Sequence, residues 1–315
     1  MRSISSFKQG PLKQVTSLIT VSLLSTRLLG ACNPQTNDAV TSNTSETATA
    51  TNPQSLKLLY WQAPTTLNPH LSPVTKDREA ASPVLEPLAA YNEAEELEPI
   101  LAAEIPTIDN GGISADNTTV TWKLKEGVLW SDGEPFTAED VIFTYNFITT
   151  PEVGSTSTEF YGEVESVEAV DELTVKVTFK QPTPAPMNPF VGGSGMILPE
   201  HVFAVFLGAD ARSAPGNTSP VGTNAFQVKE FKPGDTIVYE PNPNFRGEAP
   251  AFTAVEMKGG GDAVSAARAV LQTGEADYAW NVQAEPAVLN GLAAGGRGDM
   301  SYVPKPLMER IYINF

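Results

Sequence analysis

Hydrophobic and polar residues alternate strictly in two stretches of the chain. Residues 120–125 read VTWKLK, and residues 173–180 read LTVKVTFK. A period of two is typical of a β-strand that buries one face and exposes the other. We therefore predict two half-buried strands here, and shorter apolar strands at residues 55–61, 236–240 and 255–258.

A helical period follows the first of these strands. Residues 131–133, SDG, form a turn signal, because Gly accepts positive φ and Asp can bond the backbone that follows it. Thr137 then stands three residues before Asp140, which is the spacing of a capping box. The apolar face predicted for this helix comprises Val141, Ile142, Tyr145 and Ile148. A second helix, over residues 263–273, is predicted to end at Gly274. These elements indicate a protein of mixed α/β class.

The N-terminal 31 residues have the pattern of a secretory signal. Basic residues precede an apolar stretch at 15–32 that is too short to span a membrane. Residues 29–32, LGAC, resemble the lipobox of bacterial lipoproteins, in which the cysteine becomes the lipidated first residue. We expect a lipoprotein signal peptide at 1–31 and a lipid anchor at Cys32. Arg27 interrupts the apolar region close to the cleavage point, which weakens this interpretation without reversing it; the alternative is a plain cleaved signal peptide.

Residues 32–54 are rich in Thr, Asn, Ser and Ala, and Val40 is their one large apolar residue. Such a segment cannot bury enough apolar surface to order itself. We predict a flexible tether of about 22 residues, with a root-mean-square reach of about 25 Å.

Composition narrows the classes of partner. The 315 residues carry 20 Lys and Arg against 37 Asp and Glu, a net charge of −17, so nucleic acid is not an expected partner. Cys32 is the single cysteine, which excludes an intramolecular disulfide and a cysteine-based zinc site. His70 and His201, the two histidines, are not spaced as metal ligands, and we expect both to be ordinary surface or core residues. No metal or cofactor is predicted.

Several motifs resemble one known family. Residues 127–148, GVLWSDGEPFTAEDVIFTYNFI, are similar to the pattern of the family 5 extracellular solute-binding proteins of ABC transporters, which bind peptides, nickel and related ligands. Residues 66–70 (TLNPH), 197–203 (ILPEHVF), 220–226 (PVGTNAF), 242–247 (NPNFRG) and 274–277 (GEAD) fit the same family. Two of these depart from its pattern: Asn224 and Ala225 replace Gly-Pro, and Phe245 and Arg246 replace an aromatic pair. We expect Asn224 to adopt the left-handed conformation that Gly would supply.

The resemblance implies a periplasmic-binding-protein-like fold of two lobes, type II. Residues 55–315 would form the first lobe, with an inserted subdomain at about 80–205 and a short helix within 97–105. Residues 309–315 resemble the strand that crosses into the second lobe. Because a buried apolar strand is an unusual terminus, we expect the chain to be part of a longer protein, truncated at this crossover.

The resemblance also implies a function. The protein would be the substrate-binding component of an ABC transporter, held outside the cytoplasm by its lipid anchor, and would deliver a peptide or similar small solute to membrane permease subunits. Lys76 and Glu79 would face the ligand side, although four consecutive charges at 76–79 are also typical of a solvated loop. The residues implied as ligand contacts are Asn68, Asp77, Arg78, Thr223, Asn224, Arg310 and Tyr312.

Two other functions are kept open. One is a truncated or repurposed surface lipoprotein without a role in transport. The other is a secreted hydrolase, which the motifs do not favour: residues 192–196, GGSGM, lack the last glycine of a nucleophile elbow, and the glycines at 259–261 lack nucleotide-binding spacing. We therefore expect a binding protein and not an enzyme.

Overall fold

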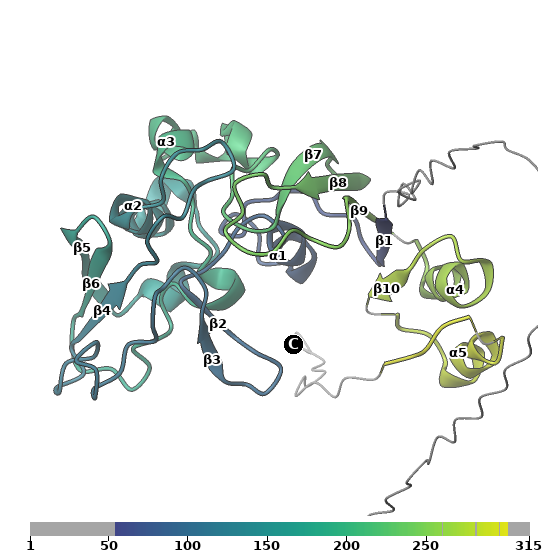
Figure 1. Ribbon diagram of the computed structural model, residues 1–315, viewed down its shortest axis with the longest axis horizontal. Helices are drawn as coiled ribbons and strands as arrows, with labels where there is room; N and C mark the ends of the chain where they lie inside the picture. The colour runs from purple at the N-terminus through teal and green to yellow at the C-terminus, as the bar shows by residue number, and fades with distance from the viewer. Residues whose placement is uncertain (1–53, 260, 281, 296, 302–315) are drawn as a thin grey trace, which may run out of the picture. The chain divides into compact units, whose positions relative to one another are not determined.

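A computed structural model describes residues 54–259, 261–280, 282–295 and 297–301 (Figure 1). The expected signal peptide, most of the tether, the lipidation site Cys32 and the crossing strand with Arg310 and Tyr312 lie outside these residues. Of the helices that the structure describes, none is long and apolar enough to cross a membrane.

One sheet has five strands in the order β10-β1-β9-β8-β7. Its strands are β1 (Ser55–Tyr60), β7 (Phe226–Lys232), β8 (Thr236–Pro241), β9 (Ala254–Gly259) and β10 (Tyr278–Trp280). The central strand β1 runs parallel to both neighbours, and Leu58 pairs with Met257 on one side and Tyr278 on the other. Strands β7, β8 and β9 pair antiparallel. The three strands expected at 55–61, 236–240 and 255–258 are thus confirmed.

One face of this sheet packs against helix α1 (Thr75–Ala81) and the loops on either side of it. The Tyr239 hydroxyl donates a 2.6 Å hydrogen bond to the carbonyl of Ala80 in α1. The buried core on this face comprises Tyr60, Leu67, Ala80, Val84, Ile237, Tyr239, Val255 and Met257. Helix α1 is therefore fixed against the sheet by apolar packing and by a buried hydrogen bond.

A second sheet contains the two strands with strict alternation. Strands β4 (Thr119–Lys123), β5 (Val164–Asp171) and β6 (Thr174–Phe179) pair antiparallel in the order β4-β6-β5. In β6, Val175, Val177 and Phe179 are buried while the residues between them are half-exposed. The alternation predicted both strands because one face of this sheet is covered.

Helix α2 (Ala138–Thr149) covers that sheet and has the predicted capping box. The Thr137 hydroxyl accepts from the Glu139 N–H, and the Asp140 carboxylate accepts from the Thr137 N–H. The predicted apolar face was only half right. Val141 and Ile148 are buried, but Ile142 and Tyr145 are half-buried, whereas Phe143, Thr144 and Phe147 are buried instead. The helix packs against both the sheet and α3 (Glu200–Phe203), so its buried face is broader than one stripe.

The short helix expected within 97–105 is wrong. Residues Leu97–Pro99 form strand β3, which pairs antiparallel with β2 (Ala89–Tyr91). Asn92 reverses the chain between them, because its side-chain oxygen accepts from the N–H groups of Ala94 and Glu96. Pairing with a neighbouring strand here outweighs the helical preference of the Leu, Ala and Glu residues in the segment.

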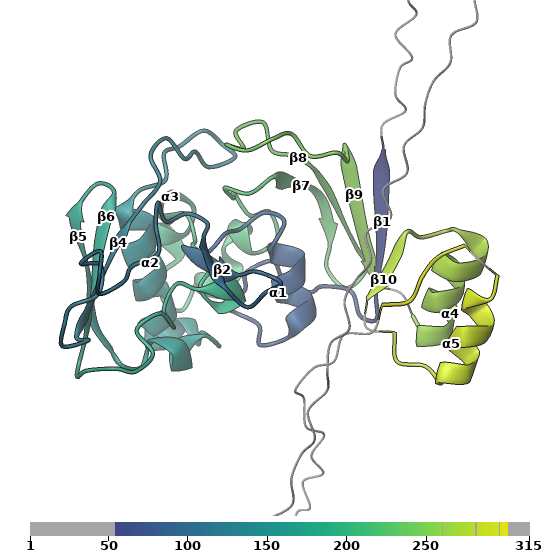
Figure 2. The same ribbon diagram turned by 60° about the horizontal axis from the view of Figure 1, so that its bottom comes forward.

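Helices lie beside β10 at the end of the described chain (Figure 2). Helix α4 (Ala263–Arg268) continues into one turn of π-helix, η7 (Ala269–Thr273), and stops at Gly274, whose φ is +69°. This end was predicted. Helix α5 (Pro286–Ala293) packs on them through Ala267, Leu271, Leu289 and Leu292. Short 3-10 turns occupy the loops, at Pro151–Val153, Thr158–Tyr161, Gly192–Ser194, Ala204–Phe206, Ala211–Ser213 and Pro215–Asn217.

The two main sheets have separate hydrophobic cores. The larger core lies around β4, β5, β6 and α2 and takes its buried residues from 71–214. The smaller core lies on the five-stranded sheet. The inserted subdomain at about 80–205 and its boundaries stay a prediction.

Candidate functional site

The parallel strands end together at one edge of the five-stranded sheet. Since β1 pairs in parallel with β9 and β10, their last residues, Tyr60, Gly259 and Trp280, are direct neighbours. In open α/β sheets, ligands bind in the crevice outside the carboxyl ends of the strands. This edge is therefore our candidate site.

Aromatic side chains cover the edge. The rings of Tyr60 and Trp280 stack with their centroids 5.2 Å apart and their planes at 16°. The next residue, Trp61, is 48% exposed. Burial raises the pKa of the Tyr60 hydroxyl, and the nearby Glu79 carboxylate raises it further, so this group stays protonated at neutral pH. At this edge the stacked Tyr60 ring is buried in the core of the sheet, while Trp61, the residue that follows β1, is exposed.

The segment that follows β1 is held close to this edge. A methyl group at Gly259 would lie only 3.0 Å from the Ala63 nitrogen, so the absence of a side chain lets the backbones approach. The Gly234 N–H donates a 2.8 Å bond to the Pro64 carbonyl. Trp61 is therefore carried on a stretch of backbone that is fixed on both sides.

Asp77 in α1 anchors the same segment. Its carboxylate is fully buried and accepts from the Thr65 N–H at 2.7 Å, the Ser72 hydroxyl at 2.6 Å and the Lys76 ammonium at 2.9 Å. Burial by itself raises the pKa of Asp77, but these three partners outweigh it and hold the pKa below its ordinary value. The carboxylate is charged and committed to partners within the protein.

Asn68 is also buried and bonded within the protein. Its amide nitrogen donates to the Asn217 side-chain oxygen at 2.9 Å, and its own oxygen accepts from the His70 N–H at 3.0 Å. His70 is fully buried, with Nε2 2.8 Å from the Met196 carbonyl and Nδ1 3.1 Å from the Ser157 hydroxyl. Because a carbonyl can only accept, Nε2 carries the proton. Burial lowers the pKa of His70 to about 4, the nearby Arg78 charge contributes to the decrease, and the ring is neutral.

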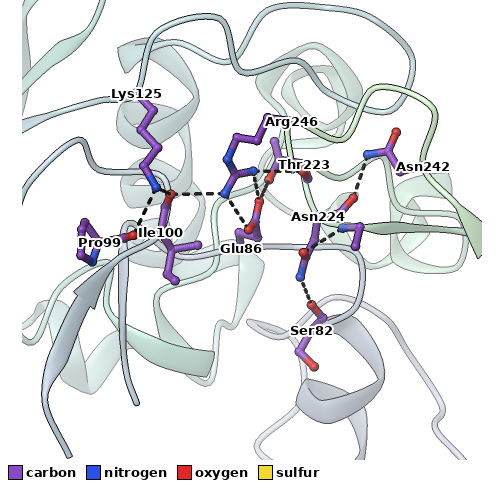
Figure 3. A network of polar contacts seen from close by, with 10 residues as sticks. Ser82, Glu86, Pro99, Ile100, Lys125, Thr223, Asn224, Asn242 and Arg246 are labelled. Carbon is purple, nitrogen blue, oxygen red and sulfur yellow. Dashed lines mark hydrogen bonds and ion pairs between the residues drawn. The ribbon is translucent and has the colours of Figure 1, made fainter. Parts of the chain in front are cut away.

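The loop that contains Thr223 and Asn224 belongs to a polar network (Figure 3). The buried Thr223 hydroxyl donates to the Glu86 carboxylate at 2.8 Å, and Arg246 binds both oxygens of the same carboxylate. Asn224 does not adopt positive φ, contrary to expectation. Its side chain fixes the turn instead, since it donates to the Ser82 carbonyl and accepts from the Ala225 N–H.

The predicted contact residues fall into three groups. The side chains of Asn68, Asp77 and Thr223 are buried and hydrogen-bonded, and that of Asn224 is bonded to backbone; direct contact with a ligand stays a prediction. Arg78 lies half-buried in α1. Arg310 and Tyr312 lie outside the described residues.

The sequence did not predict the aromatic residues of this edge or the ion pair of Arg246 and Glu86. Trp280 is the last residue of β10 and Trp61 directly follows the last residue of β1, and this position at the end of a short apolar segment is the signal that could have indicated them. Arg246 was noted only as a departure from an aromatic position, and its pairing with Glu86, 160 residues away, has no local signal. His201 likewise binds the Asp132 carboxylate at 2.8 Å, a contact that spacing did not reveal.

A hollow lined by three basic residues is a weaker candidate for the site. Its volume is about 680 Å³, and Lys123, Lys125 and Arg246 line it. All three cations already bind protein oxygens: Lys123 binds Glu104, Lys125 binds the carbonyl oxygens of residues 99 and 100, and Arg246 binds Glu86. Among the described residues, no group of three His, Cys, Asp or Glu side chains could hold a metal ion.

Comparison with known proteins identifies the family. An ABC transporter peptide-binding protein of Brucella ovis, so named, is 31% identical over 196 residues, which cover 62% of this chain and 36% of that protein. The oligopeptide-binding protein AppA of Bacillus subtilis, solved with a nonapeptide, is 25% identical with a TM-score of 0.65, over 72% of this chain and 44% of that chain. NikZ of Campylobacter jejuni, solved with Ni(L-His), is 25% identical with a TM-score of 0.62, over 71% and 43%.

These matches confirm the expected fold, the mixed α/β architecture of the type II periplasmic binding proteins. This chain spans about a third of the curated relative and less than half of each solved chain. Residues 96–315 match the family described as bacterial extracellular solute-binding proteins, family 5. Because that match covers more than half of the chain, the protein belongs to the family 5 bacterial extracellular solute-binding proteins.

Proposed function

We propose that the protein is the substrate-binding component of an ABC transporter, and that it captures a peptide or similar small solute at the carboxyl edge of β1, β9 and β10. The observation that carries this proposal is the shared carboxyl end of these strands, where the exposed Trp61 follows the stacked pair of Tyr60 and Trp280. The family supports a solute-binding role outside the cytoplasm, and the name of the Brucella relative supports peptides as the class of solute.

Binding at this edge makes and breaks no bond. Aromatic rings stack on planar groups and apolar side chains of a ligand, and the backbone polar groups at strand ends supply hydrogen bonds. Closure of a second lobe over the ligand would exclude water and strengthen these contacts. Delivery to membrane permease subunits and a lipid anchor at Cys32 complete the proposal.

The site geometry does not favour a hydrolase. A serine nucleophile requires a base within hydrogen-bond reach. In the described residues, both histidines are engaged elsewhere: His70 with Met196 and Ser157, and His201 with Asp132. Neither bonds to Ser194, the serine of the 192–196 motif, so binding without catalysis remains the proposed role.

A thermal-shift screen tests the function. A ligand that binds only the folded state raises the melting temperature by mass action. The probes are a mixture of nonapeptides, nickel with L-histidine, and an oligosaccharide mixture, each raised to millimolar concentration because weak binding is informative here. We expect the nonapeptides to stabilise the protein. If no probe raises the melting temperature, while a family member known to bind peptides responds in the same assay, the proposal is wrong for this chain.

A further inference from the structure

A buried ion pair in α1 closes on the segment that carries Trp61. Lys76 and Asp77 are adjacent in the helix, and their side chains are 8% and 0% exposed. Side chains one position apart on a helix normally do not face each other, but here the Lys76 ammonium lies 2.9 Å from the Asp77 carboxylate. Both groups also bind Thr65: the carboxylate accepts its N–H at 2.7 Å, and the ammonium lies 3.4 Å from its hydroxyl. Two charged side chains are thus committed to one residue outside the helix.

Stability alone is a poor explanation for this ion pair. Two charges that leave water lose their hydration, and a buried ion pair can often be replaced by apolar residues without loss of stability. The best attested role of buried charges is to fix one arrangement of the chain among several. The question is therefore which arrangement Lys76 and Asp77 fix.

The backbone between Thr65 and Trp61 is short and held in place. Only residues 62–64 separate the two. The Ala63 backbone lies against Gly259 in β9, and the Pro64 carbonyl accepts a 2.8 Å hydrogen bond from the turn between β7 and β8. Strand β1 fixes one end of this segment, and Asp77 fixes the other through Thr65. A displacement of Thr65 is therefore transmitted to Trp61.

We propose that Asp77 is a positioning residue for solute binding: it holds Thr65, and through Thr65 it sets the place of Trp61 at the carboxyl edge of β1, without touching the solute. This inference rests on the proposed function. A binding group that is already fixed loses less conformational entropy when a ligand binds, so affinity also depends on residues behind the contact surface. The carboxylate suits this role, because it is fully buried and bonded to Ser72, Thr65 and Lys76.

Substitutions of two buried carboxylates separate positioning from contact. Asp77→Ala removes the acceptor of the Thr65 N–H and should weaken the binding of a labelled nonapeptide mixture, measured by equilibrium dialysis, by about fivefold. Asp77→Asn keeps an oxygen for this N–H and should bind within about twofold of wild type. A carboxylate that recognised a charge on the solute would lose affinity in both variants. Asp140→Ala, the matched control in α2, should destabilise the protein and leave the affinity unchanged.

A double-mutant cycle shows the route of the effect. In a Trp61→Ala background, Asp77→Ala should weaken binding no further, because the side chain that it positions is gone. Equal losses with and without Trp61, equal losses in Asp77→Ala and Asp77→Asn, or no loss in Asp77→Ala each overturn the proposal and leave the proposed function standing. If Asp77→Ala does not fold, Ser72→Ala takes its place in the cycle with a smaller loss expected, since it removes the 2.6 Å donor to the same carboxylate.

A second measurement does not depend on peptide binding. Fluorotryptophan labels the four tryptophans, and fluorine NMR signals of Trp61 and Trp130 are assigned by their loss in Trp61→Phe and Trp130→Phe. We expect Asp77→Ala to shift the Trp61 signal alone of these two. Asp140→Ala should shift that of Trp130, whose indole donates to Asp140 at 3.3 Å, and leave Trp61 unchanged.

The two proposals can fail separately in these experiments. If the wild-type protein binds no peptide, the proposed function is contradicted, and the fluorine spectra then decide whether Asp77 positions Trp61. A shifted Trp61 signal in Asp77→Ala supports the positioning role, and an unchanged signal overturns it.

Discussion

Arg246 and Glu86 form a two-pronged ion pair between two loops that are 160 residues apart in the chain. Nη1 of Arg246 lies 2.7 Å from one oxygen of Glu86, and Nη2 lies 2.9 Å from the other. The Glu86 side chain is 7% exposed and that of Arg246 is 25% exposed. Arg246 also donates to the carbonyls of Thr223 and Ile100, so the pair joins the segments around residues 86, 100, 223 and 246.

Removing one partner of this ion pair should destabilise the folded protein. Arg246→Met leaves the Glu86 carboxylate buried without its counter-charge, and we expect the free energy of unfolding to fall by about 3 kcal/mol. Urea denaturation measures this change. The matched control is Lys123→Met, which breaks the exposed pair with Glu104 and should cost less than about 1 kcal/mol. Equal losses in the two variants would show that the buried pair contributes no more than a surface pair.

Two substitutions at the N-terminal cap of α2 should reduce stability by different amounts. Thr137→Ala removes a single side-chain acceptor, and we expect a loss of about 1 kcal/mol. Asp140→Ala should cost more, because the buried carboxylate accepts from the Thr137 N–H, the Glu200 N–H and the Trp130 indole. Urea denaturation of both variants gives the order, and a larger loss for Thr137→Ala would contradict the assignment of Asp140 as the central acceptor.

His70 predicts a dependence of stability on pH. Its pKa is lowered from 6.5 to about 4 in the folded protein. Between these values the unfolded chain binds more protons than the folded chain, so the stability is complete above pH 6.5 and falls as the pH drops towards 4, by about 3 kcal/mol in all. The effect is measured as the difference between wild type and His70→Gln in urea denaturation at each pH. This difference isolates the contribution of His70 from those of two buried carboxylates. The lowered pKa of Asp77 reduces stability only when the pH falls below the pKa of the unfolded side chain. The raised pKa of Asp140 has the opposite effect, because protonation favours the folded state.

His201→Gln is the control for this experiment, because the side chain of His201 is 35% exposed. We expect it to preserve the fall in stability between pH 6.5 and 4. A His70→Gln protein with the same pH profile as wild type would mean that the ring is charged or solvated in the folded state.

Gly222 predicts a steric effect in the loop at 220–226. A methyl group at this position would overlap the Val84 carbonyl oxygen, and Val84 also receives the Asn224 N–H. We expect Gly222→Ala to destabilise the protein by about 2 kcal/mol. Gly291→Ala, in α5, meets no atom within 4 Å and should instead stabilise by about 0.5–1 kcal/mol. Thermal unfolding of both variants checks the opposite signs.

Elements with a strong local pattern could be predicted from the sequence. The alternation in β4 and β6 and the capping box of α2 were sufficient to predict these elements, because each pattern depends on residues a few positions apart. The hairpin of β2 and β3 was missed, since its strands have three residues each and no alternation to read.

The site was less predictable than the fold. The residues chosen by resemblance, such as Asn68 and Asp77, are polar side chains whose partners proved to be other parts of the protein. The aromatic edge forms only when β1 and β10 pair, which joins residues more than 200 positions apart. Such a site depends on the pairing of distant strands, which the local sequence around each residue does not predict.

Trp61 is the exposed aromatic residue at the carboxyl edge of β1, so its removal tests most directly whether solute binds there. Equilibrium dialysis of a labelled nonapeptide mixture compares wild type, Trp61→Ala and Tyr91→Ala, where Tyr91 is an aromatic residue of β2 that is 64% exposed. We predict that Trp61→Ala weakens binding by about tenfold, because a stacking surface is lost, while Tyr91→Ala binds as wild type does. Equal affinities in all three proteins would contradict the account and place the solute elsewhere.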